Sequence, residues 1–452
     1  MAKLIMHQFA EQPAARTGGS LVRYRVLGFT VALAWITYLD RVCIASTAQD
    51  LMRDLNLSMQ QMGFVFSAFT IAYALFEIPT GAWGDRIGTR RLLTRIVIWW
   101  SSFTIATAAA FNFTSLLIVR FLFGAGEAGA FPNVSKTFSR WFPVTERGTA
   151  QGIFFAGAHL GGGLTPLLVW ILLDIFSWRI MFVIFGAIGF VWAAAWFHWF
   201  RDDPAEHSEV SLEELVHIQS GRKPEVPHRL DVATLRRVIT DRNVILLSLM
   251  YFTQAYGFYF NITWLPIYLN KARGFSSIHL GMLAGLPLML SAVADIVGGL
   301  STDRAVRAFG LRVGRCGIGL LSLLVAGTAL IAGAVAPDPL LSALLIAVAG
   351  AADSFLLGAA WGACLDIAGP HAGLVTGVMN TAGQLGAFLS PIVLAYLLKD
   401  QSRPEDWVLP LSISGGLYLA GAVCWLFIDP AKPILAPCSK KPGSPLSDLE
   451  LE

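Results

Sequence analysis

Charged residues are scarce in this chain of 452 residues: Asp, Glu, Lys and Arg make up only 14% of it. Soluble globular domains carry about 25%, so the composition argues against a soluble protein. The formal net charge of +3 is small, which disfavours a nucleic-acid partner. The five cysteines are scattered, with no CxxC pair and no disulfide framework. Residues 1–20 are mixed and polar, so we expect no cleavable signal peptide.

Catalytic signatures are also missing from the sequence. It contains no HExxH helix, no GxSxG nucleophile elbow and no phosphate-binding loop. We therefore expect no enzyme, no catalytic residue, no metal and no cofactor. Of the function classes open to this chain, a membrane enzyme is the least favoured.

Long apolar runs are what the chain has in abundance. Hydrophobic residues make up 55% of it, and the mean hydropathy is +0.61. About 20 apolar residues are needed to cross the hydrocarbon layer, and twelve runs approach or exceed that length. They cover residues 26–48, 60–83, 93–112, 115–136, 149–172, 180–200, 244–269, 279–301, 314–336, 339–363, 374–398 and 408–428. The sequence thus predicts an all-α membrane protein with twelve transmembrane helices.

The placement of the 33 Lys and Arg residues predicts the orientation. Arg41 and Arg120 fall inside spans. The loops on one side hold only six: Arg53, Arg179, Lys271, Arg273, Lys399 and Arg403. All the others fall on the side that carries both termini. By the positive-inside rule, we expect a multi-pass protein of the plasma (inner) membrane with both termini in the cytoplasm.

One long polar stretch, residues 201–243, divides the spans six and six. We therefore predict a cytoplasmic tail (1–25), a first six-helix bundle (26–200), a cytoplasmic central loop (201–243), a second six-helix bundle (244–430) and a second tail (431–452). The central loop is interpreted as a solvated linker. Its LEELVHIQ segment has the pattern of a short amphipathic helix on the membrane surface.

The two halves resemble each other. GIFFAGAHLGGGLTP (152–166) aligns without a gap with GVMNTAGQLGAFLSP (377–391), and GAWGDR (81–86) corresponds to GGLSTDR (298–304). A duplicated six-span unit follows, and it predicts two pseudo-symmetric bundles. Many secondary transporters are built in this way, with the substrate site near the midplane between the halves.

Four charges fall within apolar runs: Asp40, Arg41, Arg120 and Glu127. A charge at the bilayer centre costs at least ~2.5 kcal/mol, so it is normally paired, water-lined or functional. Arg120 and Glu127 share one helix face, whereas Asp40 and Arg41 point about 100° apart and each needs a partner elsewhere. Arg binds a carboxylate with its planar fork, and a desolvated acid can take up a proton. The alternative is a network of four charges that only locks spans one and four together.

Several segments carry a family resemblance. GAWGDRIGTRR (81–91) resembles the loop signature of the major facilitator superfamily. A closer similarity, to its anion:cation symporter branch, runs through YLDR (38–41), RFLFGAGEAGAFP (120–132), WFPVTERG (141–148), WLPIYL (264–269) and GVMNTAGQLGAFLSP (377–391). The resemblance covers essentially all twelve spans and implies transport of organic anions such as sugar acids.

The resemblance, together with polarity and position, assigns three sets of residues. Substrate binding is expected at Arg41, Tyr38, Tyr73, Trp361 and Asn380. Proton coupling is expected at Asp40, Glu127 and Arg120. A gate between spans two and three is expected at Gly81, Asp85, Arg86, Gly88 and Arg90. Plain packing is the alternative for Tyr38, Tyr73 and Trp361, and a hydrogen-bonded packing role is favoured for His159, while Glu77 is expected near the inner interface.

We therefore expect a secondary transporter that takes up an organic anion with protons by alternating access. A hexonate, hexarate or hexuronate is the expected substrate. The alternatives are an uncoupled exchanger or uniporter and, from another class, a transporter-like receptor. The expected partners are the anion, protons and the lipid bilayer, with no nucleic acid, and the monomer is the expected functional unit.

Overall fold

The computed structural model describes residues 20–143, 146–220, 232–368, 372–398, 400–432 and 434. Within this part of the chain the regular structure is helical throughout. The first bundle contains α2 (Val22–Ser46), α3 (Ala48–Asp54), α4 (Met59–Ile87), α5 (Thr89–Thr107), α6 (Phe113–Glu127), α7 (Ala130–Trp141), α8 (Arg147–Leu173) and α9 (Trp178–Trp199). The connection holds η1 (Pro204–Glu206), α10 (Leu212–Gln219) and α11 (Val232–Thr240). The second bundle contains α12 (Arg242–Thr263), α13 (Leu265–Ile267), the π-helical η2 (Tyr268–Ala272), α14 (Ser277–Phe309), α15 (Leu311–Val335), α16 (Pro339–Phe355), α17 (Leu357–Ala368), α18 (Ala372–Leu397) and α19 (Pro404–Phe427).

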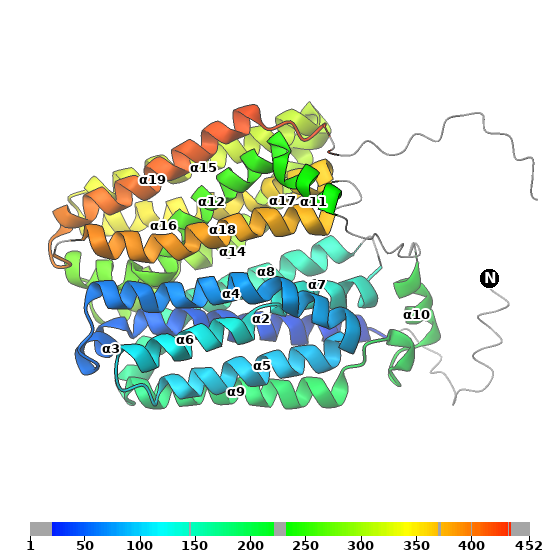
Figure 1. Cartoon of the computed structure of the whole chain (residues 1–452), viewed down its shortest axis with the longest axis horizontal. Coiled ribbons are helices and arrows are strands. Elements are labelled where there is room, and N and C mark those ends of the chain that lie inside the picture. The colour runs from blue at the N-terminus through cyan, green and yellow to red at the C-terminus, as the bar shows by residue number, and fades with distance from the viewer. Residues whose placement is uncertain are drawn as a thin grey trace, which may run out of the picture.

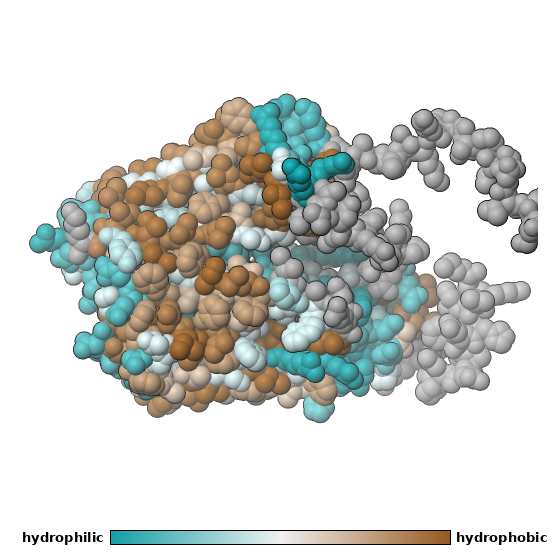
Figure 2. Space-filling model, in the orientation of Figure 1, coloured by the Kyte–Doolittle hydropathy of each residue, from teal (hydrophilic) through white to brown (hydrophobic). Residues whose placement is uncertain are grey.

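The two bundles lie side by side, and the long helices of both lie roughly along one common axis (Figure 1). The end of the molecule that carries α3 is called here the α3 end, and the opposite one, with α10 and α11, the α10 end. Apolar side chains cover much of the flank of both bundles in Figure 2, and hydrophilic ones gather toward the two ends. This distribution is what a lipid-embedded protein requires.

Ten helical segments of the described residues are long and apolar enough to cross a membrane, with α6–α7 and α16–α17 each counted as one. The remaining long helices, α5 and α12, have 19 and 22 residues. Both pack inside their bundles, α5 against α9 and α12 against α18. They complete two sets of six, in agreement with the predicted all-helical, twelve-span fold.

Several helices continue beyond the apolar runs that predicted them. The run 60–83 becomes Met59–Ile87, which begins at a capping box formed by Ser58 and Gln61. The run 279–301 becomes Ser277–Phe309, which ends at Gly310, a glycine with φ of 82°. Hydropathy marks only the segment inside the hydrocarbon, whereas capping residues and glycines set where the backbone leaves the helix.

The fourth span is broken, although the sequence analysis predicts one continuous helix over 115–136. α6 ends at Glu127, and the chain passes through Ala128 and Gly129 before α7 begins. Gly129 has φ of 85°, a conformation that side chains disfavour. Asn133 donates from Nδ2 to the Gly129 carbonyl at 2.7 Å and so uses a carbonyl at the break. The break places Glu127 at the last position of a helix inside the bundle.

The bundles meet along two helix pairs, α8 with α14 and α4 with α18. At the first crossing, a Cβ built on Gly163 would lie 3.0 Å from the Gly285 carbonyl oxygen, so the backbones touch. At the second, Ser67 Oγ donates to the Phe388 carbonyl at 2.7 Å. These pairs join spans five and eight and spans two and eleven, as the duplicated unit leads one to expect.

The central connection is more ordered than a solvated linker up to residue 220, and α10 packs on protein rather than on a membrane surface. Glu214 accepts hydrogen bonds from the backbone N–H groups of Val22 at 3.0 Å and Arg23 at 3.1 Å. Leu215 and Ile218 on the same side are buried. The α2 N-terminus offers unpaired N–H groups, and the Glu214 carboxylate satisfies two of them. Residues 221–231 lie outside the described part of the chain.

Candidate functional site

Arg41 is held by Glu127. The Arg41 Nε lies 2.5 Å from Glu127 Oε1, and Nη2 forms an ion pair with the same oxygen. Glu127 is fully buried, and the Arg41 side chain is 13% exposed. The contact joins α2 to the broken end of α6. A buried ion pair of this kind is costly to break from one side, since the remaining charge loses its partner.

Asp40 points about 100° away from Arg41, as for any two neighbouring helix positions. It is completely buried, and neither carboxylate oxygen makes a hydrogen bond of good geometry with the described residues. Its electrostatic neighbours include Glu127 and Arg120. Arg120 is 2% exposed, and its Nε and Nη1 make no hydrogen bond with the described residues. This acid and base are buried close together without direct pairing.

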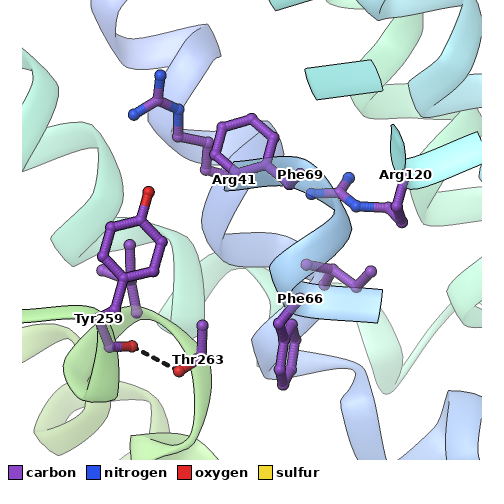
Figure 3. A pocket seen from close by; sticks show the side chains of 8 residues that line it. Arg41, Phe66, Phe69, Arg120, Tyr259 and Thr263 are labelled. Atoms are coloured by element: carbon purple, nitrogen blue, oxygen red, sulfur yellow. Dashed lines mark hydrogen bonds between the residues drawn. The ribbon is translucent and has the colours of Figure 1, made fainter. Parts of the chain in front are cut away.

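Aromatic rings enclose the Arg41 guanidinium. Its Cζ lies 5.0–5.4 Å from four ring centroids, those of Phe69, Tyr73, Tyr38 and Phe131. Phe69 also lies 5.9 Å from the Arg120 Cζ, and Figure 3 shows this ring between the two guanidiniums. A cation over a ring face is stabilised by the ring quadrupole, so the rings partly replace the water that Arg41 has lost.

A small cavity opens beside the two arginines and reaches the second bundle (Figure 3). Its volume is about 20 Å³, enough for one water molecule and too small for a six-carbon acid. It is lined by Arg41, Ile44, Phe66, Phe69, Arg120, Tyr259, Ile262 and Thr263. A larger ligand therefore requires the bundles to move apart here.

Asn380, on α18, faces the first bundle. Its Nδ2 donates to both carboxylate oxygens of Glu77 on α4, at 3.0 and 2.9 Å. Trp361, on α17, meets Tyr251 edge to face at 6.2 Å between ring centroids. The second bundle thus contributes an amide and aromatic rings opposite the charges of the first.

A second buried pair crosses between the bundles. His159 Nδ1 on α8 lies 2.6 Å from Asp295 Oδ2 on α14. The His159 ring also meets Tyr38 edge to face at 5.6 Å. The pair therefore borders the site on the side of the α8–α14 crossing, and His159 is hydrogen-bonded as expected.

The predicted gate residues are only partly described. Gly81, Asp85 and Arg86 lie on α4, but the side chains of Asp85 and Arg86 lie outside the described part of the structure. Gly88 has φ of 81° and links α4 to α5. The backbone N–H of Arg90 donates to Asp202 at 3.0 Å, and its guanidinium donates to the Phe197 carbonyl. These contacts stay inside the first bundle and its connection, so the gate remains a prediction.

Most of the predicted binding and coupling residues come together in space. Arg41, Tyr38 and Tyr73 cluster in the first bundle beside Asp40, Arg120 and Glu127. Three aromatic residues of the site were not predicted from the sequence: Phe69 and Phe131 beside Arg41, and Tyr259 at the cavity. Glu77 was expected near the inner interface, whereas it faces Asn380 across the two bundles. Nothing distinguishes those aromatic residues from others in apolar spans, and Glu77 had only its charge as a signal.

The family comparison matches residues 30–391 to the model described as Major Facilitator Superfamily. A relative named "Probable sulfoacetate transporter SauU", from Cupriavidus necator, is 34% identical over 424 residues, covering 92% of this chain and 96% of its own. The hexuronate transporter of Bacillus subtilis is 31% identical, with 88% and 91% covered. The D-galactonate transporter of an Escherichia coli strain is 30% identical, with 83% and 89% covered.

Among solved structures, the chain resembles a bacterial homologue of the human lysosomal transporter Spinster. The TM-score is 0.73 at 20% identity, and the match covers 91% of this chain and 99% of the other. At this identity the likeness concerns the fold alone. It places the two-bundle arrangement described above among solved transporter structures.

Proposed function

Because the chain belongs to the major facilitator superfamily, a transporter family, we propose that it takes up an organic anion together with protons. The bundles rock about their common interface and expose one site alternately to each side of the membrane. The protein lies in the plasma (inner) membrane with both termini in the cytoplasm. The monomer is the functional unit. The predicted substrate is a sugar acid, a hexonate, hexarate or hexuronate.

The substrate class rests on the site and on the relatives. An arginine enclosed by aromatic rings suits a carboxylate, and the amide of Asn380 suits hydroxyl groups. Relatives carry the names of sulfoacetate, galactarate/D-glucarate, hexuronate and D-galactonate transporters. Arg41 binds the anionic group, Tyr38 and Tyr73 border it, and Trp361 and Asn380 close the site from the second bundle.

One observation carries the proton coupling: Glu127 already occupies the fork of Arg41. An anion that binds Arg41 has to displace this carboxylate, and an ionised Glu127 left without its partner in a buried site is costly. A proton on Glu127 removes that cost. Asp40 and Arg120, buried nearby without direct pairing, provide a second acid and a balancing charge. Anion binding and proton uptake therefore favour each other.

Uptake into proteoliposomes tests this function. Labelled sugar acids and sulfoacetate are offered with and without an inward proton gradient, to wild type, Asp40→Asn and Arg41→Ala. We expect one anion to accumulate only with the gradient. Arg41→Ala loses binding and uptake, whereas Asp40→Asn loses accumulation and keeps exchange of labelled for unlabelled substrate.

Arg53→Ala is the control, because Arg53 is an exposed arginine at the α3 end that pairs locally with Asp50. It should transport like wild type. Accumulation without any gradient dependence would point to an uncoupled exchanger or uniporter instead. Saturable binding with no uptake would point to a receptor.

A further inference from the structure

The contact between Glu77 and Asn380 joins the two bundles at the site. A single nitrogen, Asn380 Nδ2, donates to both Oε1 and Oε2 of Glu77. Both side chains are only partly exposed at the α4–α18 interface. Neither charge nor position of Glu77 alone reveals this partner, since the two residues lie on different bundles.

A carboxylate fixes which way an amide points. An ionised carboxylate only accepts hydrogen bonds, and an amide has a donor end and an acceptor end. With Nδ2 turned to Glu77, the acceptor Oδ1 of Asn380 is left for other partners. The Oδ1 atom can then accept from a hydroxyl group, and any N–H of Nδ2 that is still free to donate lies beside the Glu77 carboxylate. An anionic group near this position would also meet the charge of Glu77 itself.

Glu77 belongs to the same electrostatic cluster as the anion-binding arginine. It interacts with Arg41 and with Tyr73, which lies one helical turn before it on α4. A ligand whose anionic group binds Arg41 therefore directs its other end toward the second bundle. There it meets the Glu77–Asn380 pair.

We propose that Glu77 is a positioning residue that sets specificity: through Asn380 it selects monoanions with a hydroxyl group and disfavours dianions. The inference rests on the proposed function and narrows its substrate class from sugar acids in general to hydroxylated monoanions. Relatives bear the names of transporters for both charge types, so the relatives alone do not decide between them.

Matched ligand pairs isolate this effect. Galactonate and galactarate differ only by a CH2OH group in place of a carboxylate, and 2-hydroxyethanesulfonate and sulfoacetate differ in the same way. For the purified protein, Kd is obtained for each ligand from the ligand-dependent rise in unfolding temperature. Uptake of the same ligands is measured in proteoliposomes. In whichever pair binds, we expect wild type to prefer the hydroxyl member at least about tenfold, the usual scale for a mismatched hydrogen bond to a charged group.

Glu77→Gln keeps the shape of the side chain but offers both a donor and an acceptor, so the Asn380 amide is free to turn. We expect the preference to fall to within about threefold. In an Asn380→Leu background the Glu77→Gln change should alter the ratio clearly less than in wild type, because the part of the effect that passes through the amide is then absent. Gln60→Leu is the control: Gln60 also bonds across α4 and α18, to the Ala395 carbonyl at 3.3 Å, and its ratio should match wild type.

A wild-type preference for the dianion would overturn the inference. So would a Glu77→Gln protein that binds its ligands with the wild-type ratio. If wild type binds a pair but transports neither member, the proposed function fails, and the Kd ratios still decide on Glu77. If it binds neither pair, the organic-anion assignment fails, and the inference fails with it.

Discussion

In the proposed mechanism, Glu127 and the transported anion compete for the guanidinium of Arg41. In the structure Glu127 holds Arg41 through two nitrogens, and four aromatic rings leave few other directions of approach. The affinity for substrate at this residue is therefore a difference between two carboxylate contacts. Whatever weakens the Glu127 contact should strengthen the contact with the anion.

Glu127→Gln should raise the affinity for the anion about tenfold, because a neutral amide holds Arg41 less strongly than a carboxylate. In wild type, Kd should increase with rising pH as Glu127 loses its proton and competes for Arg41. In the variant this part of the pH dependence should disappear. Binding titrations across the pH range provide the measurement.

The control for that experiment is Glu209→Gln, which removes an exposed carboxylate that pairs with Arg25 far from the site. It should leave both the affinity and the pH profile unchanged. A Glu127→Gln protein that binds more weakly than wild type would contradict the competition.

At the scale of single residues, the sequence predicted what was chemically unusual. Asp40, Arg41, Arg120 and Glu127 stand out because charges in apolar runs are expensive, and all four are buried or nearly so. The aromatic residues around Arg41 carry no such signal, since Phe and Tyr are common in membrane spans. The partner of Glu77 depends on how the bundles face each other and cannot be read from one span.

Among the elements, α10 caps the N-terminus of α2, the helix that carries Arg41. Burial alone would raise the pKa of Glu214, but hydrogen bonds from Ser20 and from the backbone N–H groups of Arg23 and Val22 outweigh it. The pKa of Glu214 therefore lies below its ordinary value of 4.5. A lowered pKa in the folded state means that the ionised carboxylate stabilises the fold.

Glu214→Ala should lower the free energy of unfolding at pH 7 by about 1–2 kcal/mol, as for loss of a helix cap. The stabilisation is complete above pH 4.5 and is lost as the pH falls through the lowered pKa of the folded state. The difference from wild type should therefore shrink in acid. Thermal unfolding of the purified protein at several pH values measures it.

Glu213→Ala is the matched control, because Glu213 is the exposed neighbour of Glu214 on the same helix. It should unfold like wild type at every pH. A Glu214→Ala penalty that stays constant down to strongly acidic pH would rule out the carboxylate as its source.

The elements themselves were largely predictable, with two exceptions of different kinds. Apolar runs located the long helices, but not the break after Glu127, because Gly, Ala and Phe are all tolerated within membrane helices. The LEELVHIQ segment was predicted as a helix, yet its apolar side packs on α2 and the first bundle. An amphipathic pattern does not say which apolar surface the helix will cover.

For the whole molecule, the proposed alternating access requires the bundles to separate at each end in turn. At the α3 end they are joined by Gln49, whose Nε2 donates to Asn270 Oδ1 at 3.0 Å. The cavity beside Arg41 has room for about one water molecule, so a sugar acid needs more space there than this structure offers.

A short cleavable thiol cross-link between Gln49→Cys and Asn270→Cys should therefore abolish uptake, and reductant should restore it. The background should carry Ser at Cys316 and Cys438, so that the introduced pair reacts alone. Proteoliposome uptake before and after reduction is the measurement.

A cross-link between Asp54→Cys and Arg179→Cys is the control. This pair lies at the same end, with Arg179 Nη1 3.4 Å from Asp54 Oδ2, but both residues belong to the first bundle. Uptake should persist with that link in place. Undiminished uptake through the Gln49–Asn270 link would argue against rocking of whole bundles.

The two-bundle plan was predictable from the internal repeat. Gly161 packs on Trp35 of α2, and its counterpart Gly386 packs on Phe252 of α12, so aligned glycines make equivalent contacts in the two halves. The contacts between halves were not predictable in the same way. Asp295 is aligned with Glu77 and His159 with Gln384, but Asp295 bonds to His159 whereas Glu77 bonds to Asn380 rather than to Gln384.

The close crossing of α8 and α14 limits which substitutions the chain can accept at Gly163 and Gly285. A methyl group on Gly285 would overlap the backbone of Gly163, and one on Gly163 would press on Gly285. At this point, therefore, a change in one half is limited by the backbone of the other half. Replacing either glycine introduces a steric clash where α8 and α14 cross. We expect related sequences with this crossing to keep both glycines, because a side chain on either one meets the backbone of the other helix.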